Sequence, residues 1–331
     1  MAPTVAIAGV TGKFSQCIIK ALQSHPEVTI RGYCRSPQKL PKSIIDSDRI
    51  EIIAGEFDDY NSIRNFVRGS DVVICCYFGG PEVMTQGQQL LIDACEEEKV
   101  PRYIAGDFAV DFTKIPPGAL FPKESAMIIR EYLKSKNVAG VHILTGGLME
   151  TFWSAFFGIW RPETRSLSVW GNGDEKWELT TFPTAAAYTA AVALDRNAVG
   201  FLRCEMKPPF LPHLIEERVK LTYLKVCGDR KSPEEIKETF DRVYGCQMRI
   251  DRLGSIEELY GAVEEAFNRD PNDLARWAPA CFAYWCTNGK AYLGDNLDNN
   301  RYPAVEVVDL ESFLVDHKME ELHKADQLLV A

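Results

Sequence analysis

Short apolar runs alternate with amphipathic stretches along the N-terminal half of the chain. The first run, Val5 to Ala8, ends at a glycine-spaced turn, and the amphipathic stretch that follows, 16–24, predicts a helix. The pattern predicts further strands at 28–34, 49–54, 71–77, 103–105 and 141–144, and helices from about 62, over 82–98 and over 123–136. Strands that alternate with helices predict an α/β fold with a doubly wound, Rossmann-like parallel sheet.

The pattern changes after Gly147. Beyond it we predict a strand with a turn, an alanine-rich helix and two amphipathic helices, at 169–173, 184–193, 233–244 and 255–268. Residues 1–150 would form the Rossmann-like domain, on which 181–206 packs back. Residues 151–180 and 207–331 would form a smaller C-terminal α+β lobe that binds substrate.

Five aromatic residues lie close together just after Gly147. Phe152, Phe156 and Trp160 are spaced four apart, which predicts that they share one face of a helix. Trp153 and Phe157 would form a second stripe on the same helix. One interpretation assigns the aromatic run to the core. The other is that one stripe packs while Trp153 and Phe157 line an apolar pocket for a flat aromatic substrate.

The turn after the first predicted strand has the pattern Gly9-x-x-Gly12-x-x-Ser15. A strand that stops at such a turn and begins a helix directs backbone N–H groups toward one point, at the positive end of the helix dipole, which suits a pyrophosphate. The spacing differs from G-x-G-x-x-G, and Ser15 replaces the third glycine. The strand before the turn and the helix after it still favour a dinucleotide site over a purely structural turn.

The residues after the second predicted strand indicate which dinucleotide binds. In a doubly wound sheet they lie beside the adenine ribose, where a carboxylate selects NAD and an arginine accommodates the 2′-phosphate of NADP. Arg35 and Lys39 stand here with no carboxylate between them. The alternative is that both are solvated loop residues. The pattern favours NADP(H), because a guanidinium binds phosphate through two hydrogen bonds and the ammonium adds a second charge.

Composition narrows the class of function. The 331 residues carry a net charge of −10 without a basic tract, which argues against a nucleic acid or a membrane as partner. The ten cysteines include no C-x-x-C pair and the five histidines form no ligand cluster, so we expect no metal. Because the glycine turn begins so near Met1, we expect no targeting peptide, and without one we expect a cytoplasmic protein. We expect this protein to be a monomer or a homodimer.

Polar residues at the end of the predicted strand 103–105 are candidates for contact with substrate. Asp107 and Asp111 would lie near the nicotinamide and orient the substrate, with Phe108 beside them. The alternative is that they form turns and caps, as aspartates often do. His142 lies within a predicted strand, and we interpret it as a packed, hydrogen-bonded histidine.

Several motifs together resemble a known family. They are AGVTGKF at 8–14, Arg35, GEFD at 55–58 in place of G-D-x-x-D, AGDFAVD at 105–111 in place of P-S-E-F-G-x-D, WGNG at 170–173 and DNNRYP at 298–303 in place of N-x-R-Y-P. In order and spacing they resemble those of the NmrA-like and isoflavone-reductase-like atypical short-chain dehydrogenase/reductases, especially the fungal members. The resemblance covers nearly the whole chain.

This resemblance implies a Rossmann-type domain with a small C-terminal substrate lobe and NADP(H) as the cofactor. The enzymes of the family that it resembles reduce phenolic or polycyclic natural products, and some members of that family bind NADP as redox sensors. The residues that would hold the cofactor, from the pyrophosphate through the 2′-phosphate and adenine to the nicotinamide, are Gly9, Thr11, Gly12, Lys13, Phe14, Arg35, Lys39, Glu56, Phe57, Tyr77, Phe78, Gly147 and Met149.

A lysine implied by the resemblance is displaced in this chain. In isoflavone-reductase-like enzymes it lies on the helix after the S-E-F-G segment and positions the cofactor or relays a proton. That position falls on Ala126, and the nearest lysine, Lys123, lies one turn earlier on the same helix face. Because a small gap in 118–122 would restore the register, Lys123 is the catalytic candidate. The alternative is a surface lysine at a helix start.

A second lysine matches a different pattern. Tyr132 and Lys136 have the Y-x-x-x-K spacing of ordinary short-chain dehydrogenases. They lie at the end of their predicted helix, away from the sheet edge where a cofactor binds. We interpret the match as accidental, with Tyr132 packed and Lys136 solvated.

Together these features predict an NADPH-dependent reductase. It would transfer a hydride to an apolar, aromatic or polycyclic ketone, enone or quinone-like carbon, with Lys123 or an ordered water supplying the proton. One alternative is a non-catalytic, NADP(H)-sensing regulator, which the displaced lysine keeps open. Another is a non-redox isomerase or cyclase of secondary metabolism on the same scaffold.

Overall fold

The computed structural model describes residues 2–198 and 221–328, which form two compact units. The first unit takes its described residues from 1–107, 125–143 and 189–224, and the second takes its own from 108–124, 144–188 and 225–331. The predicted domain boundaries stay a prediction. Their stretch over 199–220 lies outside the described residues.

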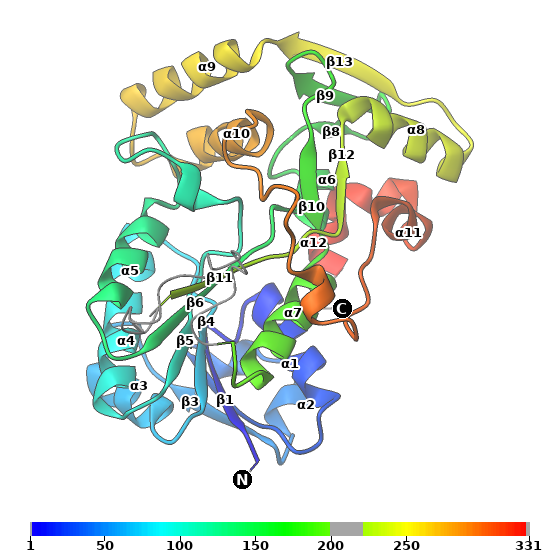
Figure 1. The fold of residues 1–331 in the computed structure, drawn as a ribbon. Helices are drawn as coiled ribbons and strands as arrows, with labels where there is room; N and C mark the ends of the chain where they lie inside the picture. Colours follow the sequence, from blue (N-terminus) through cyan, green and yellow to red (C-terminus); the bar gives the residue numbers. More distant parts are fainter. Residues whose placement is uncertain (1, 199–220, 329–331) are drawn as a thin grey trace, which may run out of the picture. The chain divides into compact units, whose positions relative to one another are not determined.

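A seven-stranded sheet forms the centre of the first unit (Figure 1). Its order is β3-β2-β1-β4-β5-β6-β11, and every neighbouring pair from β3 to β6 is parallel. This is the order of a doubly wound sheet, with the switch point between β1 and β4, so the predicted fold class is confirmed. The strands are β1 (Thr4–Ala8), β2 (Thr29–Cys34), β3 (Ile50–Ala54), β4 (Val72–Cys75), β5 (Arg102–Ile104), β6 (Ala139–Leu144) and β11 (Leu221–Lys225).

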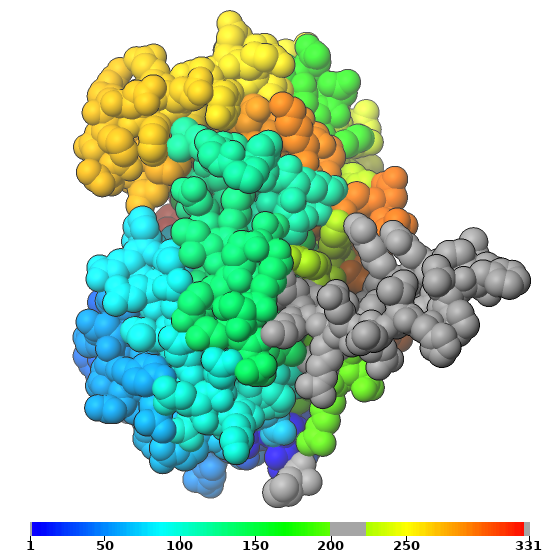
Figure 2. Space-filling view, turned by 60° about the vertical axis from the view of Figure 1, so that its left-hand side comes forward, coloured from blue at the N-terminus to red at the C-terminus, as the bar shows by residue number. Residues whose placement is uncertain are grey.

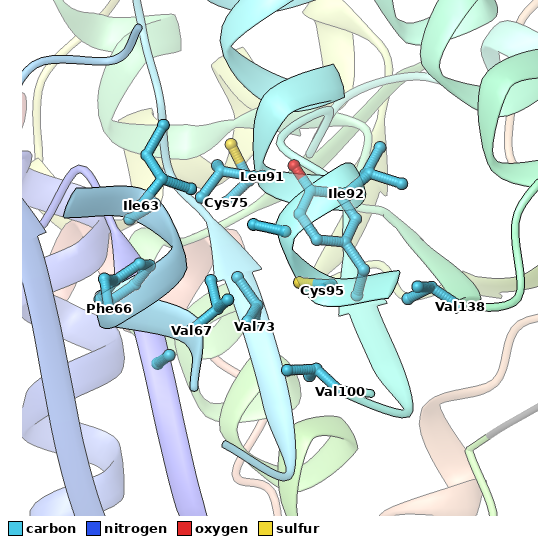
Figure 3. Packing of buried hydrophobic residues seen from close by; sticks show 14 of the residues in the cluster. Ile63, Phe66, Val67, Val73, Cys75, Leu91, Ile92, Cys95, Val100 and Val138 are labelled. Atoms are coloured by element: carbon cyan, nitrogen blue, oxygen red, sulfur yellow. The ribbon is translucent and has the colours of Figure 1, made fainter. Parts of the chain in front are cut away.

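Helices cover both faces of this sheet. One face packs against the core that α3, α4 and α5 share with β1, β4 and β5, where Phe66, Leu91 and Cys95 are fully buried (Figure 3). Figure 2 shows this helical layer from outside, in cyan to green. The helices are α1 (Lys13–Gln23), α2 (Lys42–Ile45), α3 (Tyr60–Val67), α4 (Gln88–Glu97) and α5 (Glu124–Lys134), with the short turns η1 (Pro37–Lys39) and η2 (Val83–Gly87).

The alanine-rich helix α7 (Phe182–Leu194) ends in the first unit. Arg102 of β5 is buried there, and its guanidinium donates to the carbonyls of Ala193 at 2.6 Å and Asp195 at 2.8 Å. A cation at the last carbonyls of a helix also compensates the negative end of its dipole. Arg102 therefore anchors the end of α7 to the sheet.

The second unit contains two small three-stranded sheets, in the orders β12-β10-β7 and β13-β9-β8. The strands are β7 (Gly147–Leu148), β8 (Trp160–Arg161), β9 (Ser166–Trp170), β10 (Trp177–Thr180), β12 (Asp229–Lys231) and β13 (Arg249–Gly254). The helices are α6 (Met149–Trp153), α8 (Pro233–Tyr244), α9 (Ile256–Arg269), α10 (Leu274–Thr287), α11 (Leu310–Val315) and α12 (Ala325–Leu328), with η3 (Phe112–Lys114), η4 (Asn299–Arg301) and η5 (Met319–Lys324). In 2–198 and 221–328, no helix has both the length and the apolar character needed to cross a membrane.

The prediction that Phe152, Phe156 and Trp160 share one helix face is wrong. Helix α6 stops at Trp153, and Trp160 already belongs to β8. The hydroxyl of Ser154 donates to the Thr151 carbonyl at 2.8 Å and accepts from the backbone N–H of Phe156 at 3.2 Å, a local alternative to helical hydrogen bonds. The four-residue spacing therefore does not correspond to one helix face.

Candidate functional site: a dinucleotide cradle and the lysine before helix α5

The turn between β1 and α1 requires a glycine at its first position. Gly9 has φ of +83°, and its N–H donates to the Tyr33 carbonyl at 2.8 Å. A Cβ there would lie 2.6 Å from the carbonyl oxygen of Cys76, so the end of β4 leaves no room for a side chain. The glycine pattern therefore reflects the close approach of β1 and β4 at the switch point.

Ser15, at the place of the expected third glycine, binds the backbone of the turn through its hydroxyl. It is fully buried, and its hydroxyl lies 2.7 Å from the carbonyl oxygen of Gly12 and 2.9 Å from that of Gly9. Gly12 caps α1 without a side-chain hydrogen bond, and the first turn of α1 contains no acidic residue. The start of α1 thus presents the positive end of its dipole without a carboxylate of its own, which suits a phosphate group. Thr11, Lys13 and Phe14, partly exposed, complete this turn.

Two cations lie in the loop after β2. Because β2 runs parallel to β1, this loop begins at the same edge of the sheet as the turn after β1. Arg35 directly follows the strand and Lys39 ends η1, both with exposed side chains. Arg35 Nε lies 3.9 Å from Glu56 Oε2, and these side chains are 73% and 61% exposed. Such a long, solvated ion pair contributes little energy, so an incoming phosphate can replace it. The geometry fits the predicted 2′-phosphate site.

Aromatic side chains follow β3 and β4 at this edge. Phe57 and Tyr77 both pack on Gly87 of η2, where a Cβ would lie 3.2 and 3.3 Å from their rings. The hydroxyl of Tyr77 is buried with no hydrogen-bond partner among the described residues, and burial raises the pKa of Tyr77, so it stays protonated. The neighbouring Phe78 is 93% exposed, an unusual state for a phenylalanine. These rings provide apolar surface beside the phosphate turn.

The turn after β5 is fixed by a buried acid. The carboxylate of Asp107 lies 2.5 Å from Nδ1 of His142, and both side chains are buried. The His142 ring also stacks on Tyr223, with 5.2 Å between ring centroids. The packed, hydrogen-bonded interpretation of His142 is confirmed. The proposed contact of Asp107 with substrate stays a prediction.

Asp111, in the second unit, is a structural residue. It caps η3, accepting from the Thr113 N–H at 3.2 Å, and lies 2.6 Å from Lys225 Nζ. The capping alternative is confirmed for this aspartate.

Lys123 belongs to the segment of the second unit that leads into α5. It is partly exposed and directly precedes Glu124, the first residue of the helix. The segment is anchored to α10: the indole N–H of Trp285 donates to the Leu120 carbonyl at 2.7 Å, and Phe121 packs edge-on against Trp285. Ala126, where the resemblance would place the lysine, is buried. The only described lysine near the start of α5 is therefore held by a rigid aromatic support.

The remaining predicted residues of the second unit differ in accessibility. Gly147 begins β7, and Met149 is fully buried. Trp153 is also fully buried, against Phe152, Trp160 and Phe240. In this conformation Trp153 is a core residue, which corrects its assignment to a pocket wall. Phe108 is nearly buried, whereas Phe157 is partly exposed and packs edge-on against Trp177, so it keeps surface for a ligand.

A family model and several curated relatives match this chain. A family model described as NAD(P)H-binding matches residues 9–153. A bifunctional pinoresinol-lariciresinol reductase of Forsythia intermedia is 20% identical over 94% of this chain and 97% of its own length. One from Linum usitatissimum is 22% identical over 77% of this chain and 79% of its own. These matches show an NAD(P)H-binding domain and a distant likeness to such reductases, and membership of the isoflavone-reductase-like family stays a prediction. Membership of its fungal branch stays a prediction.

Solved structures share the fold of nearly the whole chain. An isoflavone reductase superposes with a TM-score of 0.74 at 16% identity, covering 95% of this chain and 99% of its own. A structure of AtPrR2 with NADP+ and (+)pinoresinol gives a TM-score of 0.75 at 16% identity, covering 95% of this chain and 98% of its own. At such low identity, these likenesses establish the fold.

The Y-x-x-x-K pair, Tyr132 and Lys136, is structural. The Tyr132 hydroxyl donates to the Asp93 carboxylate at 2.7 Å, and Lys136 Nζ lies 2.6 Å from the same carboxylate and above the Tyr132 ring. Burial, followed by the bond to Asp93, raises the pKa of Tyr132, the opposite of what a catalytic tyrosine needs. The prediction that Lys136 is solvated is wrong, because Asp93 and Glu96 bind it on α4.

Proposed function

We propose that this protein is an NADPH-dependent reductase of an apolar, aromatic or polycyclic small molecule. The observation that carries the proposal is the combination of an α1 start without its own carboxylate and two exposed cations after β2. Its distant relatives include pinoresinol-lariciresinol reductases, which supports the reductase class. The substrate carbon would be that of a ketone, enone or quinone-like group.

The chain's own residues would hold the cofactor in two places. The pyrophosphate would lie against the turn from Gly9 to Phe14, and the 2′-phosphate between Arg35 and Lys39. Glu56 and Phe57 would border the adenine, and Tyr77 and Phe78 the ribose and the nicotinamide side. Gly147 and Met149 would border the nicotinamide. When bound, NADPH supplies the hydride.

Lys123 would supply the proton. Reduction of a carbonyl carbon leaves negative charge on the oxygen, and an ammonium group stabilises that charge and can donate a proton to it. Phe157 and Phe108 would then offer apolar surface to the substrate. Asp107, held by His142, would orient the substrate through the turn that it closes.

The test measures NADPH oxidation by the purified protein with a panel of aromatic ketones, enones and quinones. Lys123→Ala should lower kcat at least about ten-fold, the usual scale for losing a positioned proton donor, and leave the NADPH Kd unchanged. Lys134→Ala, at the exposed end of the same helix, is the matched control and should keep full activity. Equal activity in the Lys123 variant would refute its catalytic role.

The same experiments separate the alternatives. Tight binding that prefers one redox state of the cofactor, without turnover of any substrate, would support a sensor. Turnover without any change of the NADPH absorbance would support an isomerase or cyclase. Arg35→Asp should abolish the preference for NADPH over NADH. A preserved preference would refute the 2′-phosphate assignment.

A further inference from the structure

A buried glutamine connects two of the loops at the cofactor edge. Gln88 begins α4 and is 2% exposed. Its side-chain N–H donates to the Met84 carbonyl at 2.8 Å, while its side-chain oxygen accepts from the Gly106 backbone N–H at 3.1 Å and the Tyr103 hydroxyl at 3.0 Å. The oxygen has two lone pairs, and both have a donor. Sequence reasoning missed Gln88, because its partners are distant in sequence.

On one side, Gln88 fixes the turn η2. This turn, Val83–Gly87, is π-helical, whereas α4, which follows it, is a regular α-helix. The Gln88 side chain binds the Met84 carbonyl within the turn. The turn ends at Gly87, which supports the rings of Phe57 and Tyr77. The two rings therefore pack on the end of η2.

On the other side, Gln88 fixes the turn after β5. Ala105, Gly106 and Asp107 reverse direction tightly, with the Asp107 N–H donating to the Ala105 carbonyl at 3.0 Å. A Cβ on Gly106 would lie 3.0 Å from the Cys75 carbonyl oxygen, so the turn presses on the end of β4. The ends of β4 and β5 are in register, beyond the switch point, on the side that holds the nicotinamide half of a dinucleotide in doubly wound sheets.

We infer that Gln88 is a positioning residue for the nicotinamide half of the cofactor site, acting through Gly106. The inference rests on the proposed NADP(H) function. A glutamine amide donates and accepts at this reach without carrying a charge. A methionine of similar size would leave the Gly106 N–H and the Met84 carbonyl without their partner in a buried place, and the turn would move.

Two ligands test this inference by calorimetry. NADPH contacts both halves of the site, whereas adenosine 2′,5′-bisphosphate contains only the adenine half and its 2′-phosphate. Gln88→Met should weaken NADPH binding about ten-fold or more, the cost of one or two buried groups without partners, and leave the bisphosphate Kd within about two-fold. Tyr103→Phe is the matched control. It removes the other donor to Gln88 but keeps the Gly106 bond, so both affinities should stay at the wild-type value.

The outcomes distinguish a positioning role from general destabilisation. Equal weakening of both ligands, or of neither, would overturn the inference. If the wild-type protein binds neither ligand, the proposed function fails and takes the inference with it. If Gln88→Met does not fold, amide exchange in the wild-type protein decides. NADPH should slow exchange at 105–107 and the bisphosphate should not, and equal protection by both would refute the placement.

Discussion

Helices α1 and α8 begin in opposite ways, although each start leaves backbone N–H groups to be satisfied. At the start of α8, the Ser232 hydroxyl accepts from the Glu235 N–H and the Glu235 carboxylate accepts from the Ser232 N–H, a complete capping box. Helix α9 repeats the arrangement with Ser255 and Glu258. At α1 the cap is Gly12, without a side-chain bond.

The difference separates a helix start built for stability from one built for a ligand. A capping box binds N–H groups and places a carboxylate at the positive end of the dipole, so an anion is repelled there. A carboxylate also binds the start of α7, but it comes from a residue outside the helix. The buried side chain of Glu150 accepts from the Phe182 N–H at 2.9 Å. Among these four helices, α1 is the one whose start has neither a side-chain cap nor a carboxylate, as our proposed phosphate site requires.

Converting α1 into a helix of the α8 type should have the largest effect. Gly12 has φ of −73° and ψ of 151°, a conformation open to any residue, so Gly12→Asp should fold. Its carboxylate would occupy the place of the pyrophosphate and repel it, so we expect NADPH binding to weaken about a thousand-fold, ~4 kcal/mol. Calorimetry measures the affinity, and thermal unfolding should show unchanged or slightly higher stability.

Gly12→Ala is the control for this substitution. Its Cβ would lie 3.4 Å from the Gly9 carbonyl oxygen, so the alanine adds bulk without charge. The alanine variant should therefore lose much less affinity than the aspartate variant. Equal losses would show that space at the turn matters and that the dipole does not.

Removing the charge at the start of α7 should have the next largest effect. Burial raises the pKa of Glu150 from 4.5 to about 7, although the Phe182 N–H opposes the shift. Between these values the unfolded chain releases a proton that the folded protein keeps, so stability falls as the pH rises from 4.5 to 7. Glu150→Gln should remove this loss and gain up to about 3 kcal/mol over wild type across that interval.

Urea unfolding of both proteins at several pH values measures this difference. Glu163→Gln, at an exposed position, should follow the wild-type curve. A constant difference between Glu150→Gln and wild type from pH 4.5 to 7.5 would contradict the raised pKa.

Breaking a cap in the second unit should have the smallest effect. Ser232→Ala removes the hydroxyl that accepts from the Glu235 N–H, so the free energy of unfolding should fall by about 1 kcal/mol. NADPH affinity should stay at the wild-type value, because the cofactor residues at the start of α1 lie in the first unit. If Ser232→Ala lowered the NADPH affinity and left the free energy of unfolding unchanged, the roles that we assign to the starts of α1 and α8 would be wrong.

Local signals explain what could be predicted from the sequence. Helix α8 has its predicted bounds, because Ser232, Pro233 and Glu235 mark its start and Gly245, with φ of +62°, its end. The strand, turn and helix around Gly9 and Gly12 are equally local. The cation pair after β2 could be predicted to lie at the cofactor edge because, in a doubly wound sheet, β2 is the neighbour of β1 and ends at the same edge.

Long-range contacts explain what could not be predicted. Trp153 is buried because Phe240, far along the chain, stacks on it, and no spacing within the aromatic run reveals that partner. Lys136 pairs with Asp93 on another helix, and Glu150 receives the first N–H of α7. Side chains whose partners lie on other elements cannot be assigned from periodicity alone.

The path of the chain has a practical consequence for experiments on separate pieces. Each compact unit is assembled from three stretches of sequence, and the chain passes from one unit to the other after residues 107, 124, 143, 188 and 224. No single cleavage or truncation therefore releases either unit with all of its parts. A fragment that ends near residue 150 would keep the phosphate turn but lose the end of α7, whose carbonyls the buried guanidinium of Arg102 binds. Producing one unit alone would require cuts at all five crossings and two linkers to join its three stretches.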